Sequence, residues 1–202
     1  EFVDQMLIKT LQAKHVAVGA NFQFGRNREG NAALLKRLAE SAGTKVHVVS
    51  ILEDKQGRIS SSRIRLALQE GDLKTAEAHM GRPYRFLGKV VKGRGIGRNL
   101  GWPTANLEID GRKFLPCLGV YAAWAWKNGT GEALAAVMNL GPQPTIDPAS
   151  PSAVEVHIIN QEIDLNGFEI VIEPVLKLRG QKTFKNLAEL SNQIGLDVQL
   201  AT

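Results

Sequence analysis

The chain has 202 residues, of which 44% are hydrophobic and 22% are charged, a composition typical of a globular protein and not of a disordered one. The formal net charge of +5 is mild and does not by itself require a nucleic-acid partner. The longest apolar runs, Val120–Trp126 and Ala133–Met138, are far shorter than the ~20 residues of a membrane-spanning helix. Cys117 is the only cysteine, which excludes an intrachain disulfide and favours a reducing, cytoplasmic setting.

The first 80 residues alternate between helical and strand-like patterns, which predicts a parallel sheet covered by helices. Only two strands are visible, too few for a stable sheet. The pattern therefore predicts that the chain begins partway through an α/β domain. The expected elements are helix Phe2–Leu11, strand His15–Val18, helix Asn31–Ser41, strand Val46–Leu52, helix Ser60–Glu70 and a helix from Asp72 to near Gly81.

From Phe86 onward the pattern changes to short segments rich in valine, isoleucine, phenylalanine and tryptophan, which predicts an antiparallel barrel or sandwich. Asn166-Gly167 is a strong hairpin-turn signal because both residues tolerate positive φ. The expected domains are therefore 1–82 and 83–202. The expected elements of the second domain are strands Phe86–Val91, Val120–Trp126, Ala133–Met138, Val154–Ile159 and Phe168–Leu178, followed by a closing helix, Lys185–Ala201.

A glycine-rich loop precedes the segment Pro103-Thr104-Ala105-Asn106. Its glycines allow backbone N–H groups to approach an anion closely. Thr104 and Asn106 lie two residues apart, so on an extended segment their side chains share one side. Oxygen ligands of this kind suit Mg²⁺ beside phosphates. The alternative is a glycine-rich hairpin in which the threonine and asparagine only shape a turn.

Alternation places Glu155 and His157 on one face of a predicted strand. A carboxylate near a phosphate site can accept a hydroxyl proton, and the alternative is a solvated glutamate. His157 is expected to be structural.

Two other segments carry basic charge. Ile59–Arg65 opens a helix with three serines and two arginines, which suits either an anion site or a simple serine cap. The stretch from Arg82 to Arg98 has six basic residues and no acid. A small barrel with such a basic stretch leaves open a module that binds single-stranded nucleic acid. Against this alternative, only 6% of the residues are aromatic and the stretch holds just Tyr84 and Phe86 as stacking candidates.

These segments together resemble the bacterial bifunctional riboflavin kinase/FMN adenylyltransferase family, also called FAD synthetase, over essentially the whole chain. The combination of P-T-A-N with a downstream E-V-H is the most specific part of the resemblance. The similar segments are Gly19–Gly25 with Arg28 and Gly30 (G-x-[DN]-F-x-F-G), Ile59–Arg65 (I-S-S-[ST]-x-[IV]-R), Gly88–Leu107 (ending in P-T-A-N-L), Asn139–Thr145 (N-x-G-x-x-P-T), Val154–Ile159, and Leu178-Arg179 with Phe184 (L-R…F).

The resemblance implies a fold and a set of roles. It implies a partial nucleotidylyltransferase-type doubly wound α/β domain followed by a six-stranded antiparallel β-barrel with a C-terminal helix. It implies Glu155 as the catalytic base, Thr104 and Asn106 as ligands of Mg²⁺, and Arg179 and Phe184 near flavin. The remaining implied residues are Gly93, Gly95, Arg98, Gly101, Thr104 and Asn106 for ATP, and Asn21, Phe24, Gly25, Ser61, Ser62 and Arg65 for the nucleotide of the adenylyltransferase.

The implied reaction is phosphoryl transfer from ATP to riboflavin, which gives FMN. The family's adenylyltransferase, which forms FAD, also carries an H-x-G-H segment that binds ATP phosphates. None of the four histidines here lies in such a segment. We therefore expect a C-terminal portion of the enzyme that is inactive as an adenylyltransferase. The expected partners are small molecules, namely ATP, riboflavin and FMN, with Mg²⁺ as the cofactor and with no nucleic acid or membrane.

Overall fold

A computed structural model describes residues 1–93, 95–141, 153–161 and 163–202. The chain forms two compact units, Glu1–Ile59 and Ser60–Thr202. The domain boundary expected between residues 82 and 83 stays a prediction.

The unit Glu1–Ile59 contains one parallel β-α-β arrangement, as the sequence predicts. Strand β1 (His15–Gly19) pairs in parallel with β4 (Lys45–Val49). Helix α1 (Ala32–Glu40) connects them and begins at Asn31, whose side chain accepts a hydrogen bond from the Leu34 amide. The smaller elements are helices η1 (Phe2–Thr10) and η2 (Arg26–Arg28) and strands β2 (Gln23–Phe24), β3 (Gly30–Asn31), β5 (Glu53–Asp54) and β6 (Gly57–Arg58). The buried core of this unit is Val3, Leu35, Ala39 and Val46.

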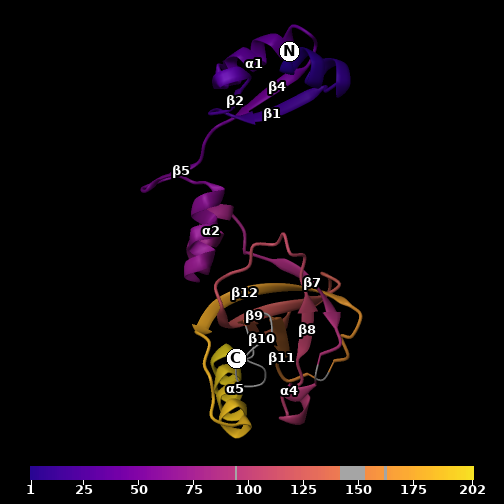
Figure 1. Cartoon of the computed structure of the whole chain (residues 1–202), viewed down its shortest axis with the longest axis vertical. Coiled ribbons are helices and arrows are strands. Elements are labelled where there is room, and N and C mark those ends of the chain that lie inside the picture. The colour runs from indigo at the N-terminus through magenta and orange to yellow at the C-terminus, as the bar shows by residue number, and fades with distance from the viewer. Residues whose placement is uncertain (94, 142–152, 162) are drawn as a thin grey trace. The chain divides into compact units, whose positions relative to one another are not determined.

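The unit Ser60–Thr202 contains a closed antiparallel barrel, which confirms the six-stranded prediction (Figure 1). Neighbouring strands follow the order β10-β11-β8-β7-β12-β9. Side chains alternate between the barrel interior and its outer face, as strand β7 shows by burying every second residue. The strands are β7 (Phe86–Val91), β8 (Ala105–Glu108), β9 (Gly119–Lys127), β10 (Leu134–Gly141), β11 (Ala153–Ile158) and β12 (Glu169–Arg179).

Two helices pack against this barrel. Helix α2 (Ser61–Glu70) begins at the Ser60 cap, and α3 (Leu73–Met80) begins at the Asp72 cap. Both end at a glycine with positive φ. Their apolar faces share one buried cluster with the barrel interior, including Leu68 and Leu73.

Helix α5 (Leu187–Ala201) covers part of the outer face of the barrel (Figure 1). Val198 and Ala201 of this helix pack against the buried Val120 and Val137 of β9 and β10. The closing helix expected from the sequence is therefore confirmed. Within the described ranges, no helix has the length and apolar character needed to cross a membrane.

The hairpin expected at Asn166-Gly167 is wrong. A turn does form there, and the Phe168 amide donates to the Leu165 carbonyl. However, β12 pairs with β7 and β9 and not with the preceding strand β11. An Asn-Gly pair that does join two paired strands is Asn128-Gly129, between β9 and β10, where both residues have positive φ.

Candidate active site

Two residues expected in the kinase site, Glu155 and Asn106, lie in one row across the barrel. Glu155 of β11 is directly opposite Asn139 of β10 on one side and Asn106 of β8 on the other. Side chains directly opposite each other in antiparallel strands have Cβ atoms about 4.5–5.5 Å apart. The register thus brings together three polar side chains from segments far apart in the sequence. The full row, in order of neighbouring strands, is Arg179, Val120, Asn139, Glu155, Asn106 and Val91.

This row faces outward from the barrel. Its neighbours along the strands, such as Val154 and Val156, are buried in the interior cluster, so the residue between them points to the opposite face. Glu155 itself is half-buried. The alternation predicted for Glu155 and His157 is therefore confirmed, and the environment of Glu155 differs from that of a fully solvated carboxylate.

The glycine-rich loop lies directly against this polar row. A Cβ atom at Gly93 would overlap the amide nitrogen of Asn106, and one at Gly97 would overlap the Trp102 carbonyl and lie 3.2 Å from the hydroxyl of Thr104. Only glycine allows the loop backbone to approach so closely. At these two positions the loop therefore packs directly on Asn106 of the row and on the segment that carries Thr104.

The other loop residues predicted to bind ATP are two glycines with positive φ and an exposed arginine. Gly95 and Gly101 have φ values of +72° and +84°, so a side chain at either position would be strained. Arg98 is exposed on the short helix α4 (Ile96–Asn99). Arg94 and residues 142–145 of the N-x-G-x-x-P-T segment lie outside the described residues.

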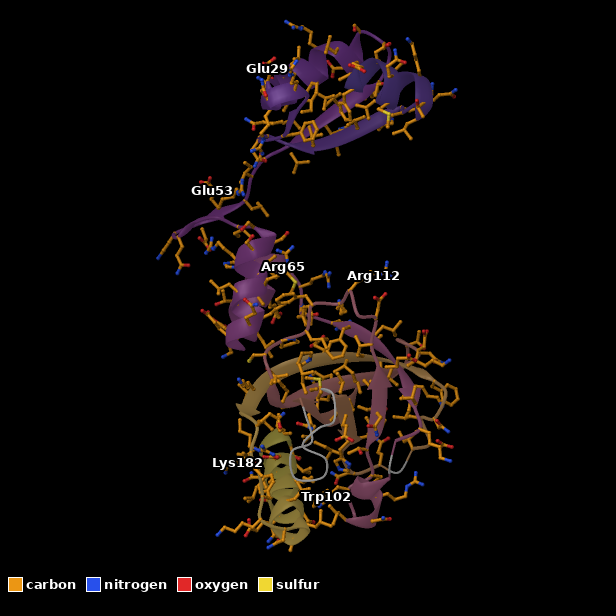
Figure 2. All side chains as sticks on the ribbon, viewed as in Figure 1. Glu29, Glu53, Arg65, Trp102, Arg112 and Lys182 are labelled. Carbon is orange, nitrogen blue, oxygen red and sulfur yellow. The ribbon has the colours of Figure 1, made fainter. Side chains whose placement is uncertain are left out.

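A tryptophan that the sequence analysis did not single out fixes the end of the loop. The indole Nε1 of Trp102, which is labelled in Figure 2, donates to the Ser191 hydroxyl of α5. The two atoms are 3.0 Å apart. The Trp102 ring meets the His157 ring edge-on at 5.6 Å. His157 is buried, and its Nδ1 lies 2.8 Å from the Pro103 carbonyl. His157 thus has the structural role predicted for it, and it holds the backbone next to Thr104.

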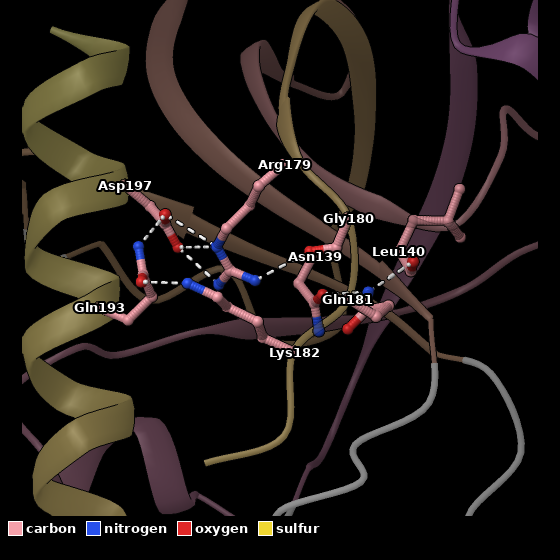
Figure 3. A network of polar contacts seen from close by, with 8 residues as sticks. All are labelled: Asn139, Leu140, Arg179, Gly180, Gln181, Lys182, Gln193 and Asp197. Carbon is pink, nitrogen blue, oxygen red and sulfur yellow. Dashed lines mark hydrogen bonds and ion pairs between the residues drawn. The ribbon is translucent and has the colours of Figure 1, made fainter.

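Arg179 is held by helix α5. Its guanidinium makes three hydrogen bonds of 2.7–3.1 Å to the carboxylate of Asp197, which is 2% exposed (Figure 3). It also donates to the Gly180 carbonyl and lies 5.8 Å from the ring of Phe184. Arg179 and Phe184 are therefore close together, as their shared prediction requires. The contact with Asp197 was not predicted.

The residues predicted for the adenylyltransferase fall in both units. Asn21, Phe24 and Gly25 belong to Glu1–Ile59, whereas the exposed Ser61, Ser62 and Arg65 lie on α2 in the other unit. Phe24 packs in the core of its unit, and a Cβ at Gly30 would lie 2.7 Å from its ring. A shared site of these residues stays a prediction.

The aromatic residues proposed to stack on nucleic acid are buried. Tyr84 is 8% exposed and Phe86 is 2% exposed, both within the barrel core. The Tyr84 hydroxyl donates to the Phe114 carbonyl, and burial raises its pKa to about 12. Side chains in this position offer no face for a base to stack on, so the two stacking candidates do not support the nucleic-acid alternative.

Asn106 and the nearby Thr104 offer oxygen atoms of the kind that bind a hard cation. The Asn106 amide turns its nitrogen toward Gly93, and its oxygen lies farther from that glycine. With the Thr104 hydroxyl, this oxygen matches the ligand type that Mg²⁺ prefers when phosphates supply the remaining ligands. Within the described ranges, no group of three or more histidine, cysteine, aspartate or glutamate side chains is arranged to hold a metal ion.

The chain is similar to known proteins along most of its length. A bifunctional riboflavin kinase/FMN adenylyltransferase from Haemophilus influenzae is 35% identical over 99% of this chain and 64% of its own length. The Bacillus subtilis protein of the same name is 34% identical over 100% of this chain and 63% of its own length. The chain thus spans less than two thirds of the length of these curated relatives.

A solved structure from Streptococcus pneumoniae, named a macrolide-efflux protein, superposes with a TM-score of 0.81 at 29% identity. The match includes 100% of this chain and 64% of the Streptococcus pneumoniae chain. The family model for FAD synthetase matches residues 1–63, and the model for riboflavin kinase matches residues 80–202. Since this second match includes every strand of the barrel and more than half of the chain, the protein belongs to the riboflavin kinase family.

Proposed function

We propose that this chain is an ATP-dependent riboflavin kinase, which transfers the γ-phosphoryl group of ATP to the 5′-hydroxyl of riboflavin and gives FMN and ADP. The observation that carries the proposal is the row in which Glu155 lies between Asn139 and Asn106, against the glycine-rich loop. The family and the names of the relatives supply the substrates.

The glycine-rich loop would bind the ATP phosphates. At Gly95 no atom lies within 4 Å of where a side chain would stand, so an anion could approach the backbone closely there, and the exposed Arg98 adds positive charge at the same segment. Phosphoryl transfer depends chiefly on positioning and on neutralising charge. The close packing of the loop on Asn106 would fix the phosphates relative to Glu155.

Thr104 and Asn106 would hold the Mg²⁺ that accompanies ATP. When bound, the ion would neutralise charge on the phosphate oxygens. The contact between His157 and the Pro103 carbonyl keeps the backbone before Thr104 in place, so its hydroxyl would keep its position beside Asn106.

Glu155 would act as the base. Its carboxylate would accept the proton of the riboflavin 5′-hydroxyl as that oxygen bonds to the γ-phosphorus and the bond from phosphorus to the bridging oxygen of ADP breaks. Phe184 and the segment after Arg179 would contact the flavin from the end of β12.

The longer proteins that this chain resembles are named as FMN adenylyltransferases as well. We place Asn21, Phe24, Gly25, Ser61, Ser62 and Arg65 in that activity of the longer protein, with a domain boundary at 82/83. A cytoplasmic enzyme that acts on small molecules fits these assignments.

The test is to incubate the full chain with riboflavin, ATP and Mg²⁺ and to measure FMN by chromatography. The Thr104→Ala variant should need more Mg²⁺ and ATP for half-maximal rate while flavin affinity stays unchanged, because it loses one oxygen ligand. The Thr130→Ala variant, at an exposed turn between β9 and β10, is the matched control. Absence of FMN from the folded wild-type chain would refute the proposal.

A further inference from the structure

The segment from Arg179, the last residue of β12, to Lys182 is anchored to α5 (Figure 3). The buried Asp197 carboxylate accepts hydrogen bonds from Arg179 and also from the Gln193 amide at 3.0 Å. Lys182 donates to the Gln193 side-chain oxygen at 3.4 Å. A buried carboxylate paired with a guanidinium in this way is costly to separate, so the start of the segment is fixed to the helix.

The same segment is also attached to the end of β10. Gln181 donates through Nε2 to the side-chain oxygen of Asn139 and to the Leu140 carbonyl, each at 2.9 Å. A Cβ atom at Gly141 would lie 2.5 Å from this nitrogen. The strand therefore ends in a glycine at the place where the glutamine amide needs the space.

These contacts determine which way the Asn139 amide points. Its oxygen accepts from Gln181, so its two N–H donors are directed away from Gln181. Asn139 is directly opposite Glu155 in the strand register. The orientation of this amide therefore decides whether donors or an acceptor are presented beside the carboxylate.

We propose that Gln181 is a positioning residue of the kinase site, which acts by fixing the Asn139 amide with its donor end available to the Glu155 side of the row. The inference rests on the proposed riboflavin kinase activity. The contacts between α5 and the segment keep Gln181 in place. The amide donors of Asn139 then stabilise the negative charge of Glu155 or of the transferring phosphoryl group.

The test compares Gln181→Met, which keeps the length of the side chain and removes its donors, with Lys185→Met, at an exposed position four residues later, as the control. Both residues lie after the end of β12 and outside the barrel strands, so both variants should fold. We expect Gln181→Met to lower kcat by about 10- to 100-fold, the order of effect that a misplaced group near the reacting atoms produces. The KM for ATP should change by less than about twofold, since the hydrogen bonds of Gln181 go to Asn139 and Leu140 of β10.

A second readout follows the amide without turnover. The side-chain NH₂ signals of Asn139 are assigned in ¹⁵N-labelled protein by their loss in Asn139→Asp. They should shift in Gln181→Met and stay in place in Lys185→Met. Signals that stay in place in Gln181→Met would overturn the contact, and shifted signals with unchanged kcat would overturn its role in catalysis. A wild-type chain that makes no FMN would refute the proposed function and, with it, this role.

Discussion

In the unit Ser60–Thr202 each barrel strand pairs with two neighbours, whereas in the described part of Glu1–Ile59 strands β1 and β4 pair only with each other. The closed barrel leaves no strand edge open. The two-stranded sheet does leave edges, and Val48 and Val49 at the end of β4 are 43% and 56% exposed.

This difference determines how firmly each set of candidate residues is placed. In the barrel, Asn139, Glu155 and Asn106 take their positions from strands that are paired on both sides. In the other unit, Asn21 and Gly25 lie in short connecting segments. Sites on rigid elements are held more precisely than sites on loops, so the proposed kinase site is the one whose geometry supports detailed predictions.

The largest effect is expected at the centre of the row. Glu155→Gln keeps the size of the side chain and removes the proton acceptor, so FMN formation should fall by about 10²–10⁴-fold. The thermal unfolding midpoint should stay unchanged. Glu53→Gln, at an exposed position in the other unit, serves as the control. Turnover near the wild-type value in Glu155→Gln would remove this residue from the mechanism.

Core substitutions test whether the two units are independent. Met138→Ala in the barrel and Leu35→Ala in the other unit each replace a fully buried side chain and should each cost about 2–5 kcal/mol in the unit that carries the change. We expect Met138→Ala to lower the temperature at which FMN formation is lost and Leu35→Ala to leave it unchanged. Equal loss of activity in both variants would show that the units unfold together.

The glycine-rich loop allows a comparison within the barrel unit. Gly93→Ala places a methyl group on the Asn106 amide, whereas Gly111→Ala has no atom within 4 Å of the added carbon. Displacement of the loop by about 1 Å should lower kcat/KM for ATP by about 10²-fold. Steady-state rates of the two variants at equal concentrations of folded protein provide the measurement, and equal rates would contradict the close packing of Gly93 on Asn106.

The smallest effect concerns pH. Burial raises the pKa of Tyr84 to about 12, above the value of about 10 expected in the unfolded chain. Because the folded state holds this proton more tightly, its contribution is complete below pH 10 and is lost as the pH rises toward 12. Urea unfolding of the wild-type chain and Tyr84→Phe should therefore converge over this range. A constant difference between the two proteins would contradict the assignment.

Much of the fold could be predicted because its signals are local. The caps at Asn31, Ser60 and Asp72 and the alternation in β7 are visible in short windows of sequence. Strand β8 was missed in the periodicity because it has only four residues and follows directly on the glycine-rich loop. Asn128-Gly129 and Asn166-Gly167 carry the same turn signal, and only long-range pairing decides that the first joins paired strands.

The candidate site divides in the same way. Glu155, Thr104 and Asn106 were predicted from residue type, spacing and resemblance, but their neighbouring positions depend on strand register across the barrel. Asp197 was missed because an aspartate in an amphipathic helix reads as exposed, whereas its partner Arg179 makes it one of the most buried side chains. No local pattern marks such a pair.

The central claim is that the unit Ser60–Thr202 contains the complete kinase site. The most direct measurement is the rate at which this fragment forms FMN from riboflavin, ATP and Mg²⁺, compared with the full chain. We expect the two rates to agree within about twofold, because every residue of the row and of the glycine-rich loop lies in this unit. A folded fragment that forms no FMN while the full chain is active would contradict the claim.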